Sequence, residues 1–264
     1  MHISVVGGDR RFRLLEGMLQ ARGHRINETA LQLADAVVLP LPAFDAKGYV
    51  RGSELHGETL LAAQPQLLLG GQLPAAFLQK AAARQIKARD YYLDETLLLQ
   101  NAAATAEGAL SLLIAELPSV IKGSGIAVIG YGRIGSRLAK LLQSMGAEVT
   151  VFARSAKARA QAAAEGISAR PMQLLAQLMP RFAAVCSTAP ALVAEDAAVQ
   201  QMREGMLWLE LASGSGGLCR EAAAKRGVRV VDGGGLPGRF SPQSAAEYIC
   251  EAVCRIFTEE GFHA

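Results

Sequence analysis

The sequence predicts an α/β fold with two doubly wound parallel-sheet domains joined by a long helix. Short apolar segments typical of strands alternate with segments of helical periodicity along the chain. Two of these strands, at residues 3–6 and 126–129, run into glycine and then into a helix. Strands that alternate with helices form parallel sheets that are covered by helices on both faces.

The composition is that of a folded globular chain. Of 264 residues, 51% are apolar and 19% are charged, which excludes a disordered chain. This length supports one large core or two modest ones. The 27 basic and 24 acidic residues leave a formal charge of +3, too small to indicate a nucleic acid or a membrane surface as a partner.

The cysteines and the N-terminus predict a cytoplasmic location. No basic segment followed by an apolar one opens the chain, and no apolar run approaches the roughly 18 residues of a membrane span. The cysteines fit no zinc pattern and no dense disulfide framework. They are Cys186, Cys219, Cys250 and Cys254. The last two lie four residues apart on one helical face, which favours core packing over a metal pair, so we predict no metal site.

Eight segments have the short apolar character of strands. They are residues 3–6, 36–39, 66–69, 126–129, 148–152, 183–186, 207–211 and 228–231. The clearest helix is predicted over 133–145, where apolar side chains recur on one face. A further helix is predicted over 244–258.

A helix of about 22 residues is predicted between the two halves of the chain. Asp94 is a good N-cap, Glu95 suits the first turn, and Pro118 marks the end. We therefore expect a flavodoxin-like α/β substrate domain at 1–95, a linking helix at 96–120 and a nucleotide domain at 121–243. In folds of this kind, a C-terminal helix such as 244–264 often packs back on the first domain.

The strongest motif is the glycine-rich turn after the strand at 126–129. It reads Gly130-Tyr131-Gly132-Arg133-Ile134-Gly135, with an amphipathic helix and a second strand behind it, as in a Rossmann dinucleotide-binding unit. The three glycines permit the tight turn, the approach of the pyrophosphate and the close packing of helix on strand. Free amides at the helix N-terminus would hold the pyrophosphate. The alternative is a glycine-rich turn without a ligand, which the complete βαβ context disfavours.

The end of the second strand of this unit predicts NADP as the cofactor. NAD sites carry an acidic residue there for the ribose hydroxyl, whereas here the chain reads Arg154-Ser155-Ala156-Lys157. Arg154 and Ser155 can bind a 2′-phosphate. Arg159 is interpreted as part of a solvated helix face.

Several glycine-rich elements together resemble the dipicolinate synthase A family, the dehydrogenase-like subunits of dipicolinate synthase, along nearly the whole chain. The matching segments are 7–10, 101–108, 130–135, 154–155, 188–190, 211–217 and 235–242. Three places depart from the family pattern: Glu210 stands for Asp, Ser215 for Pro, and residues 243–246 differ.

The resemblance implies an NADP-dependent oxidoreductase subunit of spore-forming bacteria on a branch of the lysine pathway. Its substrate would be a cyclic dicarboxylate at the tetrahydrodipicolinate level. Loss of water and hydride transfer to NADP would aromatise the ring to dipicolinate. The implied partner is the second, flavoprotein-like subunit of the enzyme, dipicolinate synthase B, and a homo-oligomer is also compatible with this reading.

Polar loops after the nucleotide-sheet strands are expected to flank the ribose and the nicotinamide. In doubly wound sheets, ligands bind beyond the carboxyl ends of the strands. For Thr188-Ala189-Pro190, an ordinary strand-to-helix turn is an equally good interpretation. The cofactor-binding residues expected from these loops are Thr188, Ala189, Pro190, Ala212 and Ser213.

Two glycine-flanked arginines are candidates to hold the substrate carboxylates. Arg10 and Arg239 follow strand ends of different domains, and either can bind a carboxylate bidentately. Asn101 and Ser213 can donate to the ring, and Thr105 can hold the linking helix in place. The alternatives are that Arg10 is a solvated residue on a basic face with Arg11 and Arg13, with Asp9 as an N-cap, and that 235–239 is an ordinary turn.

The histidines give no catalytic base. His2, His24, His56 and His263 all lie away from the nucleotide-sheet strand ends, although 2-hydroxyacid dehydrogenases need a histidine near the nicotinamide. The catalytic residue therefore stays unassigned. The alternatives are an NADP-binding protein with a regulatory or scaffold role, and a shikimate- or 2-hydroxyacid-dehydrogenase-like enzyme.

Overall fold

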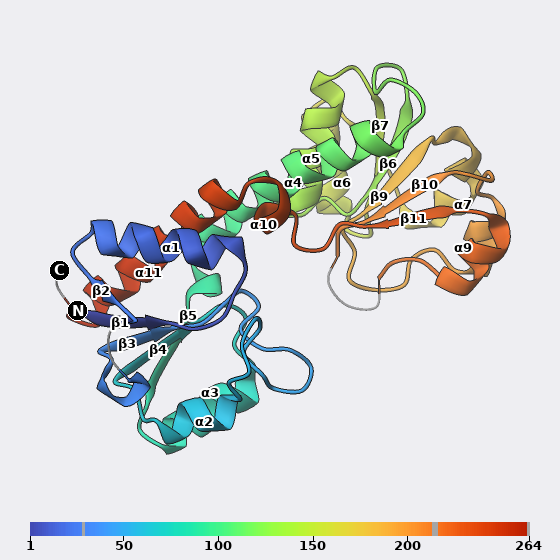
Figure 1. Ribbon diagram of the computed structural model, residues 1–264. Coiled ribbons are helices and arrows are strands. Elements are labelled where there is room, and N and C mark those ends of the chain that lie inside the picture. The colour runs from blue at the N-terminus through green and yellow to red at the C-terminus, as the bar shows by residue number, and fades with distance from the viewer. Residues whose placement is uncertain (28–29, 213–215, 263–264) are drawn as a thin grey trace. The chain divides into compact units, whose positions relative to one another are not determined.

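Two wholly parallel sheets organise the chain, as the alternation of strands and helices predicted (Figure 1). The computed structural model describes residues 1–27, 30–212 and 216–262. Contacts divide it into two units, one formed by Met1–Asn101 with Ser241–Ala264 and the other by Ala102–Phe240. These are called unit 1 and unit 2.

The sheet of unit 1 has five strands in the order β2-β1-β3-β4-β5. The strands are β1 His2–Val5, β2 Arg25–Ile26, β3 Ala36–Val38, β4 Leu67–Gly70 and β5 Lys87–Asp90. This is the flavodoxin-like doubly wound order, whose topological switch point lies between β1 and β3.

Helices cover both faces of this sheet, and the two sets of buried side chains alternate along the strands. The helices are α1 Arg10–Ala21, α2 Gly57–Ala62, α3 Ala75–Ala83 and α11 Pro242–Glu259, with 3₁₀ turns at Leu31–Leu33 and Tyr91–Leu93. Ile3 and Val38 pack under α1 and α11, whereas Val37 and Leu68 pack under α2 and α3 (Figure 1). Neighbouring residues of a strand point to opposite faces, so the inner strands are mostly apolar along their length.

The sheet of unit 2 has six strands in the order β11-β10-β9-β6-β7-β8. They are β6 Gly125–Ile129, β7 Glu148–Phe152, β8 Ser168–Arg170, β9 Ala184–Ser187, β10 Leu207–Glu210 and β11 Arg229–Asp232. Numbered within the unit, this order is 3-2-1-4-5-6, which is the Rossmann topology. The switch point lies between β6 and β9, the two strands that precede the Gly130 and Thr188 loops.

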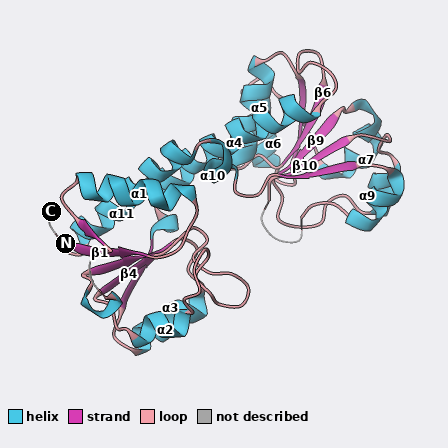
Figure 2. Cartoon of the chain, in the orientation of Figure 1, coloured by secondary structure: helices cyan, strands magenta, loops and turns pink. Residues whose placement is uncertain are grey.

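Unit 2 is also a three-layer structure (Figure 2). One face packs against α4, α5, α6 and α10, and the other against α7, α8 and α9. Their bounds are α4 Glu95–Glu116, α5 Arg133–Ser144, α6 Ala156–Ala164, α7 Leu175–Leu178, α8 Asp196–Gln200, α9 Arg220–Arg226 and α10 Leu236–Phe240, with 3₁₀ turns at Met172–Leu174 and Met179–Arg181.

The helix α4 begins at the predicted N-cap and has the predicted length of 22 residues. The carboxylate of Asp94 accepts a hydrogen bond from the Leu97 amide at 2.8 Å. Gly108 lets α10 approach, since a Cβ there would lie 2.9 Å from that of Leu236. Among the described helices, α4 alone is long and apolar enough to cross a membrane by length and composition, but half of the apolar window is buried inside the protein, as in the core helix of a soluble protein.

The strand prediction missed three edge strands, β2, β5 and β8. They have two to four residues and carry charged side chains on exposed positions, so they lack the apolar pattern that identifies a buried strand. The interpretation of 235–239 as a turn is wrong, because Leu236–Phe240 forms the short helix α10 with Leu236 and Pro237 buried.

Candidate dinucleotide-binding site

The loop between β6 and α5 is shaped by two glycines that have no room for a side chain. Gly130 has a φ of 94°, and a Cβ there would lie 2.3 Å from the hydroxyl oxygen of Thr188. A Cβ on Gly135 would lie 2.2 Å from the carbonyl oxygen of Gly130. Any side chain at either position would therefore push apart the strand, the turn and the helix.

Gly132 differs, because a Cβ there would meet no heavy atom within 4 Å among the described residues. It is the N-cap of α5, and no side chain caps this end of the helix in the described structure. The open space and the uncapped amides lie together at the positive end of the helix dipole. This arrangement fits a pyrophosphate, as the glycine motif predicted.

The side chains within the motif divide between packing and exposure. Tyr131 is buried, and its hydroxyl donates a hydrogen bond to the carboxylate of Glu165, which also pairs with Lys140 at 2.9 Å. Burial and the contact with Glu165 raise the pKa of Tyr131. Ile134 packs against the core, whereas Arg133 is exposed. The Tyr131 side chain therefore supports the loop from behind, away from solvent.

The end of β7 presents basic and hydroxyl groups and no carboxylate. Arg154 is exposed, and the hydroxyl of Ser155 accepts a hydrogen bond from the amide of Ala158 at the start of α6. Arg159 is not the freely solvated residue that we expected. Its guanidinium donates to the carbonyls of Ala153 and Arg154 at 2.8 and 2.7 Å, so it holds the turn that carries Arg154.

The loop after β9 is tied to the glycine turn. The amide and the hydroxyl of Thr188 both donate to the carbonyl of Ile129, at 2.9 and 2.8 Å. Ala189 packs against the core of unit 2 and Pro190 is exposed. The structure thus brings Thr188 and Gly130 together at the switch point of the sheet.

Glu210 is a buried carboxylate at the end of β10 that stood out in the sequence only as a departure from a pattern. It accepts hydrogen bonds from the indole of Trp208 at 3.1 Å and from the amides of Ala212 and Gly217 at 3.2 and 2.7 Å. Ala212 is therefore positioned through its backbone. Ser213 lies outside the described residues.

Ser187 lies next to Glu210 across the sheet, at the end of β9, and was not among the predicted cofactor-binding residues. Its side chain is buried, and the hydroxyl has no hydrogen-bond partner in the described structure. A Cβ on Gly217 would lie 2.5 Å from this hydroxyl. The available signal was a polar residue closing an otherwise apolar strand, and Glu210 carried the same signal.

At the turn between β1 and α1 in unit 1, one of the predicted solvated arginines is buried. Asp9 caps α1, and Arg10 is exposed. Arg11, expected on a solvated basic face, is buried instead. Its guanidinium binds both carboxylate oxygens of Asp9 and the carbonyl of Leu41, the last at 2.8 Å. This pair fixes the turn between β1 and α1, and it lowers the pKa of Asp9 although burial alone would raise it.

The remaining predicted substrate residues lie in different surroundings. The amide of Asn101 is 3.5 Å from the hydroxyl of Tyr92, and Thr105 is buried in α4. Arg239 is exposed, and its guanidinium donates to the carbonyls of Asp232 and Gly234 and stacks over Phe240. Its side chain is thus held against its own loop. A substrate role for these residues stays a prediction.

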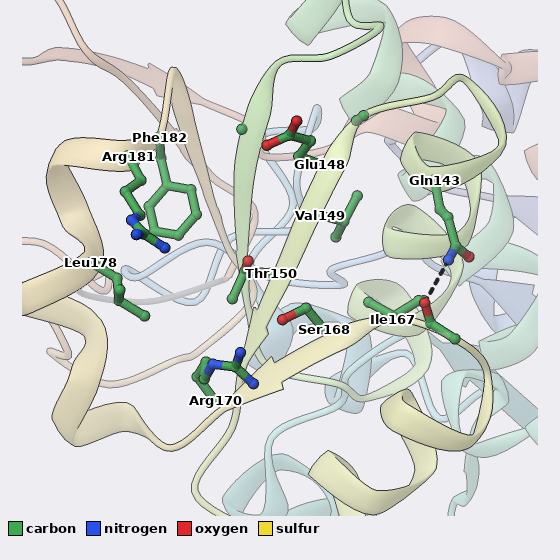
Figure 3. Close-up of a pocket in the computed structure, with 13 residues that line it drawn as sticks. Gln143, Glu148, Val149, Thr150, Ile167, Ser168, Arg170, Leu178, Arg181 and Phe182 are labelled. Atoms are coloured by element: carbon green, nitrogen blue, oxygen red, sulfur yellow. Dashed lines mark hydrogen bonds between the residues drawn. The ribbon is translucent and has the colours of Figure 1, made fainter.

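A pocket of about 420 Å³ opens elsewhere in unit 2 (Figure 3). Most of its lining comes from the amino ends of β6, β7 and β8, and Arg181 and Phe182 form the facing wall. The glycine turn lies at the carboxyl end of β6. This pocket is therefore separate from the candidate dinucleotide site.

Comparison with known protein families agrees with this site. Residues 102–214 match the NAD-binding domain of the D-isomer specific 2-hydroxyacid dehydrogenases. The match covers the glycine turn, the β7 end and the Thr188 loop. It supports a nicotinamide dinucleotide as the ligand class and an oxidoreductase-type fold.

One curated relative covers nearly the whole chain. Dipicolinate synthase A from Bacillus subtilis, one subunit of that enzyme, is 26% identical over 97% of this chain and 88% of its own length. The chain resembles dipicolinate synthase A along nearly its whole length. This confirms the resemblance that the glycine-rich segments indicated.

Solved structures show the same two-domain fold. Dipicolinate synthase A from Bacillus halodurans superposes with a TM-score of 0.85 at 24% identity, covering 97% of both chains. The Bacillus subtilis structure gives the same score and identity over 98% of this chain and 96% of its own. A transhydrogenase from Sinorhizobium meliloti shares the fold at a TM-score of 0.73 and 13% identity, over 99% of this chain and 95% of its own.

Proposed function

We propose that this chain is an NADP-dependent oxidoreductase subunit that forms dipicolinate from a cyclic dicarboxylate at the tetrahydrodipicolinate level. The resemblance to Bacillus subtilis dipicolinate synthase A over 97% of the chain supports the substrate class. The reaction would release one water and then remove a hydride and a proton, which leaves the aromatic ring. The nicotinamide would accept the hydride, and the proton would pass to solvent or to the substrate's own groups.

The observation that carries the cofactor assignment is the open space at Gly132 beside the uncapped start of α5. The amides there would hold the pyrophosphate. Arg154 and Ser155, at the end of β7, would hold the 2′-phosphate of NADP, since no carboxylate stands in residues 151–157 to receive a ribose hydroxyl. Thr188, Ala189, Pro190, Ala212 and Ser213 would flank the ribose and the nicotinamide.

The substrate carboxylates need cations or amide donors, because an unpaired buried charge costs several kcal/mol. Arg10 and Arg239 are the proposed cations, with Asn101 and Ser213 as neutral donors and Thr105 as a support for α4. Arg239 would have to exchange its bonds to the carbonyls of Asp232 and Gly234 for bonds to the substrate.

The proposed partner is the flavoprotein-like dipicolinate synthase B. The Bacillus subtilis relative is named as one subunit of its enzyme, which supports a multi-subunit assembly. Within the described residues, the three histidines belong to unit 1, so unit 2 offers no imidazole as a base. This favours, as a second candidate, an NADP-binding regulatory protein whose chemistry belongs to the partner, and it counts against a 2-hydroxyacid dehydrogenase.

Two measurements test these proposals separately. Calorimetric titration with NADP and NAD tests the cofactor, and we expect NADP to bind about 10- to 150-fold more tightly, the range of one charge-assisted contact. Arg154→Asp should remove this preference, while Arg137→Asp, on the helix α5, should largely retain it. Equal affinities in the wild type would reject NADP specificity.

The second measurement is NADPH formation from the lysine-pathway intermediate, with and without the flavoprotein-like partner. Turnover that needs both chains supports a catalytic role for this chain with an obligatory partner. Turnover by the partner alone, merely modulated by this chain, would favour the regulatory candidate. Full turnover by this chain alone would reject the need for a partner.

A further inference from the structure

Two cysteines in unit 1, outside the candidate dinucleotide site, share a cationic neighbour. Cys250 and Cys254 lie one helical turn apart on α11, where it packs against α1. The guanidinium of Arg22, at the C-cap of α1, donates to both sulfur atoms, at 3.0 Å to Cys250 and 2.9 Å to Cys254. One cation thus faces two thiols from an adjacent helix.

The two thiols differ in exposure. Cys250 is buried, whereas Cys254 is partly exposed. Cys254 also lines a pocket of about 450 Å³. The other described residues of that pocket are Arg22, His24, Phe257, Thr258 and Phe262. An incoming reagent can therefore reach the sulfur of Cys254 and place an apolar group against the phenylalanine rings, while Cys250 stays covered.

We propose that Cys254 is a reactive thiolate and the site of reversible modification by low-molecular-weight disulfides. Arg22 supplies the countercharge, and the thiol of Cys250 keeps its proton and donates a hydrogen bond to the sulfur of Cys254. The thiolate attacks one sulfur of the reagent, the Cys254–sulfur bond forms, the reagent's S–S bond breaks, and the second half leaves as a thiolate. A free thiol reverses the exchange by the same route. The proposal does not depend on the proposed function.

The charges around the pair favour the anion on Cys254. The hydrogen bond from Cys250, followed by the contact with Arg22 and the charge of Arg255, lowers the pKa of Cys254 to about 6 although burial opposes it. The same hydrogen bond raises the pKa of Cys250, so only one of the two ionises. The charge of Glu251 also raises the pKa of Cys250 and so keeps that thiol protonated, and burial keeps His24 toward its neutral form by lowering its pKa.

The helix prevents the pair from closing on itself. Side chains four residues apart on an α-helix have Cβ atoms about 5–6 Å apart. A disulfide requires a Cβ separation of about 3.5–4.5 Å, so the helix would have to distort. The stable product is therefore a mixed disulfide on Cys254 and not an internal Cys250–Cys254 bond.

The rate advantage can be predicted. At pH 6.5 a thiol of pKa 6 is ionised about 75-fold more than one of pKa 8.5, and its lower intrinsic nucleophilicity offsets about tenfold of this. The full-length protein should thus react about 5- to 10-fold faster than a simple thiol with 4,4′-dithiodipyridine, followed by absorbance from about pH 4.5 to 9. Peptide mapping should place one equivalent on Cys254, with a midpoint near pH 6.

Variants separate this assignment from a merely exposed cysteine. Cys254→Ser should remove the fast phase, whereas Cys219→Ser, at the other partly exposed cysteine, should retain it. Arg22→Gln and Cys250→Ala should keep the modification but move its midpoint upward, with folding checked by circular dichroism. A fast phase that survives Cys254→Ser, a wild-type midpoint at about pH 8 or above, or an internal disulfide as the product would overturn the proposal.

Discussion

The hydroxyl oxygen of Thr188 lies so close to Gly130 that it leaves no room for a Cβ on that residue. The two positions would be 2.3 Å apart, and the hydroxyl instead donates to the carbonyl of Ile129 at 2.8 Å. Because Ile129 and Gly130 lie at the end of β6 while Thr188 follows β9, this contact joins the two loops at the switch point of the sheet. A glycine in the phosphate motif is thus required by a neighbouring side chain as well as by any ligand.

Gly130→Ala should mainly lower the stability of the fold, whereas Gly132→Ala should mainly weaken dinucleotide binding. Gly130→Ala places a Cβ against Thr188 at a φ of 94°, so we expect a loss of about 1–3 kcal/mol in the free energy of unfolding. Gly132→Ala enters open space at a φ of −90° and should cost less than about 1 kcal/mol, yet weaken dinucleotide binding about tenfold or more. Urea denaturation and calorimetric titration measure both, and wild-type affinity in Gly132→Ala would contradict the site.

The contact between residues 130 and 188 predicts a coupled pair of substitutions. Thr188→Ala alone loses a hydrogen bond worth about 1 kcal/mol. In the double variant, the methyl group added at position 130 no longer meets the hydroxyl of residue 188. The loss of unfolding free energy caused by Gly130→Ala should therefore be smaller by about 0.5–2 kcal/mol. A double-mutant cycle measures this coupling, and strictly additive effects would show that the steric contact does not limit stability.

Asp94 caps α4 and also pairs with Arg255 on α11, at 2.8 and 2.9 Å. Asp94→Ala removes both contacts and should cost about 1–2 kcal/mol, whereas Asp94→Asn keeps the cap and should cost less than about 1 kcal/mol. Burial raises the pKa of Asp94, but Arg255 and the Leu97 amide outweigh it and lower the pKa below 3.8. The stability that the ionised Asp94 contributes is therefore complete above about pH 4–5 and is lost as the pH falls further. Thermal unfolding from about pH 3 to 7 checks both variants.

Glu210 gathers three donors in a buried place, so its replacement should be costly. Glu210→Gln keeps the shape but turns an NH₂ group toward donors such as the Gly217 amide, which should cost about 1–3 kcal/mol. The matched control is Glu221→Gln, on an exposed pair with Lys225, where we expect less than about 1 kcal/mol. Equal unfolding free energies for the two variants would contradict this role of Glu210.

The pair between Tyr131 and Glu165 predicts a pH effect at the back of the glycine turn. The Tyr131 hydroxyl, with Lys140, lowers the pKa of Glu165 below its ordinary value of 4.5. The pair therefore stabilises the fold above that pH and less as the pH falls through the lowered value. In Tyr131→Phe the melting temperature should decline less steeply between about pH 5 and 3 than in the wild type. Parallel curves would contradict the pairing.

The inner strands and the glycine turn were predictable because their signals are local. Buried strands such as 126–129 are apolar on both faces, and a βαβ unit places the motif on a strand, a turn and a helix in sequence order. The start of α4 was equally clear, since Asp94 caps through residues three positions away. The edge strands β2, β5 and β8 were not predictable, because they have no apolar pattern of their own and form strands only by pairing with an inner strand, whereas the edge strand β11 has that pattern and was predicted.

By itself, the sequence determined the two doubly wound sheets, the dinucleotide turn and the basic end of β7, because each of them has a pattern that lies within a short stretch of the chain. Only the tertiary structure decided that Arg11 is buried on Asp9, that Arg239 binds its own loop, and that Arg22 faces Cys254, 232 residues away. The physical reason is that a charged side chain has the same sequence signature whether solvent or a distant partner satisfies it. Its environment is fixed only when separate elements pack.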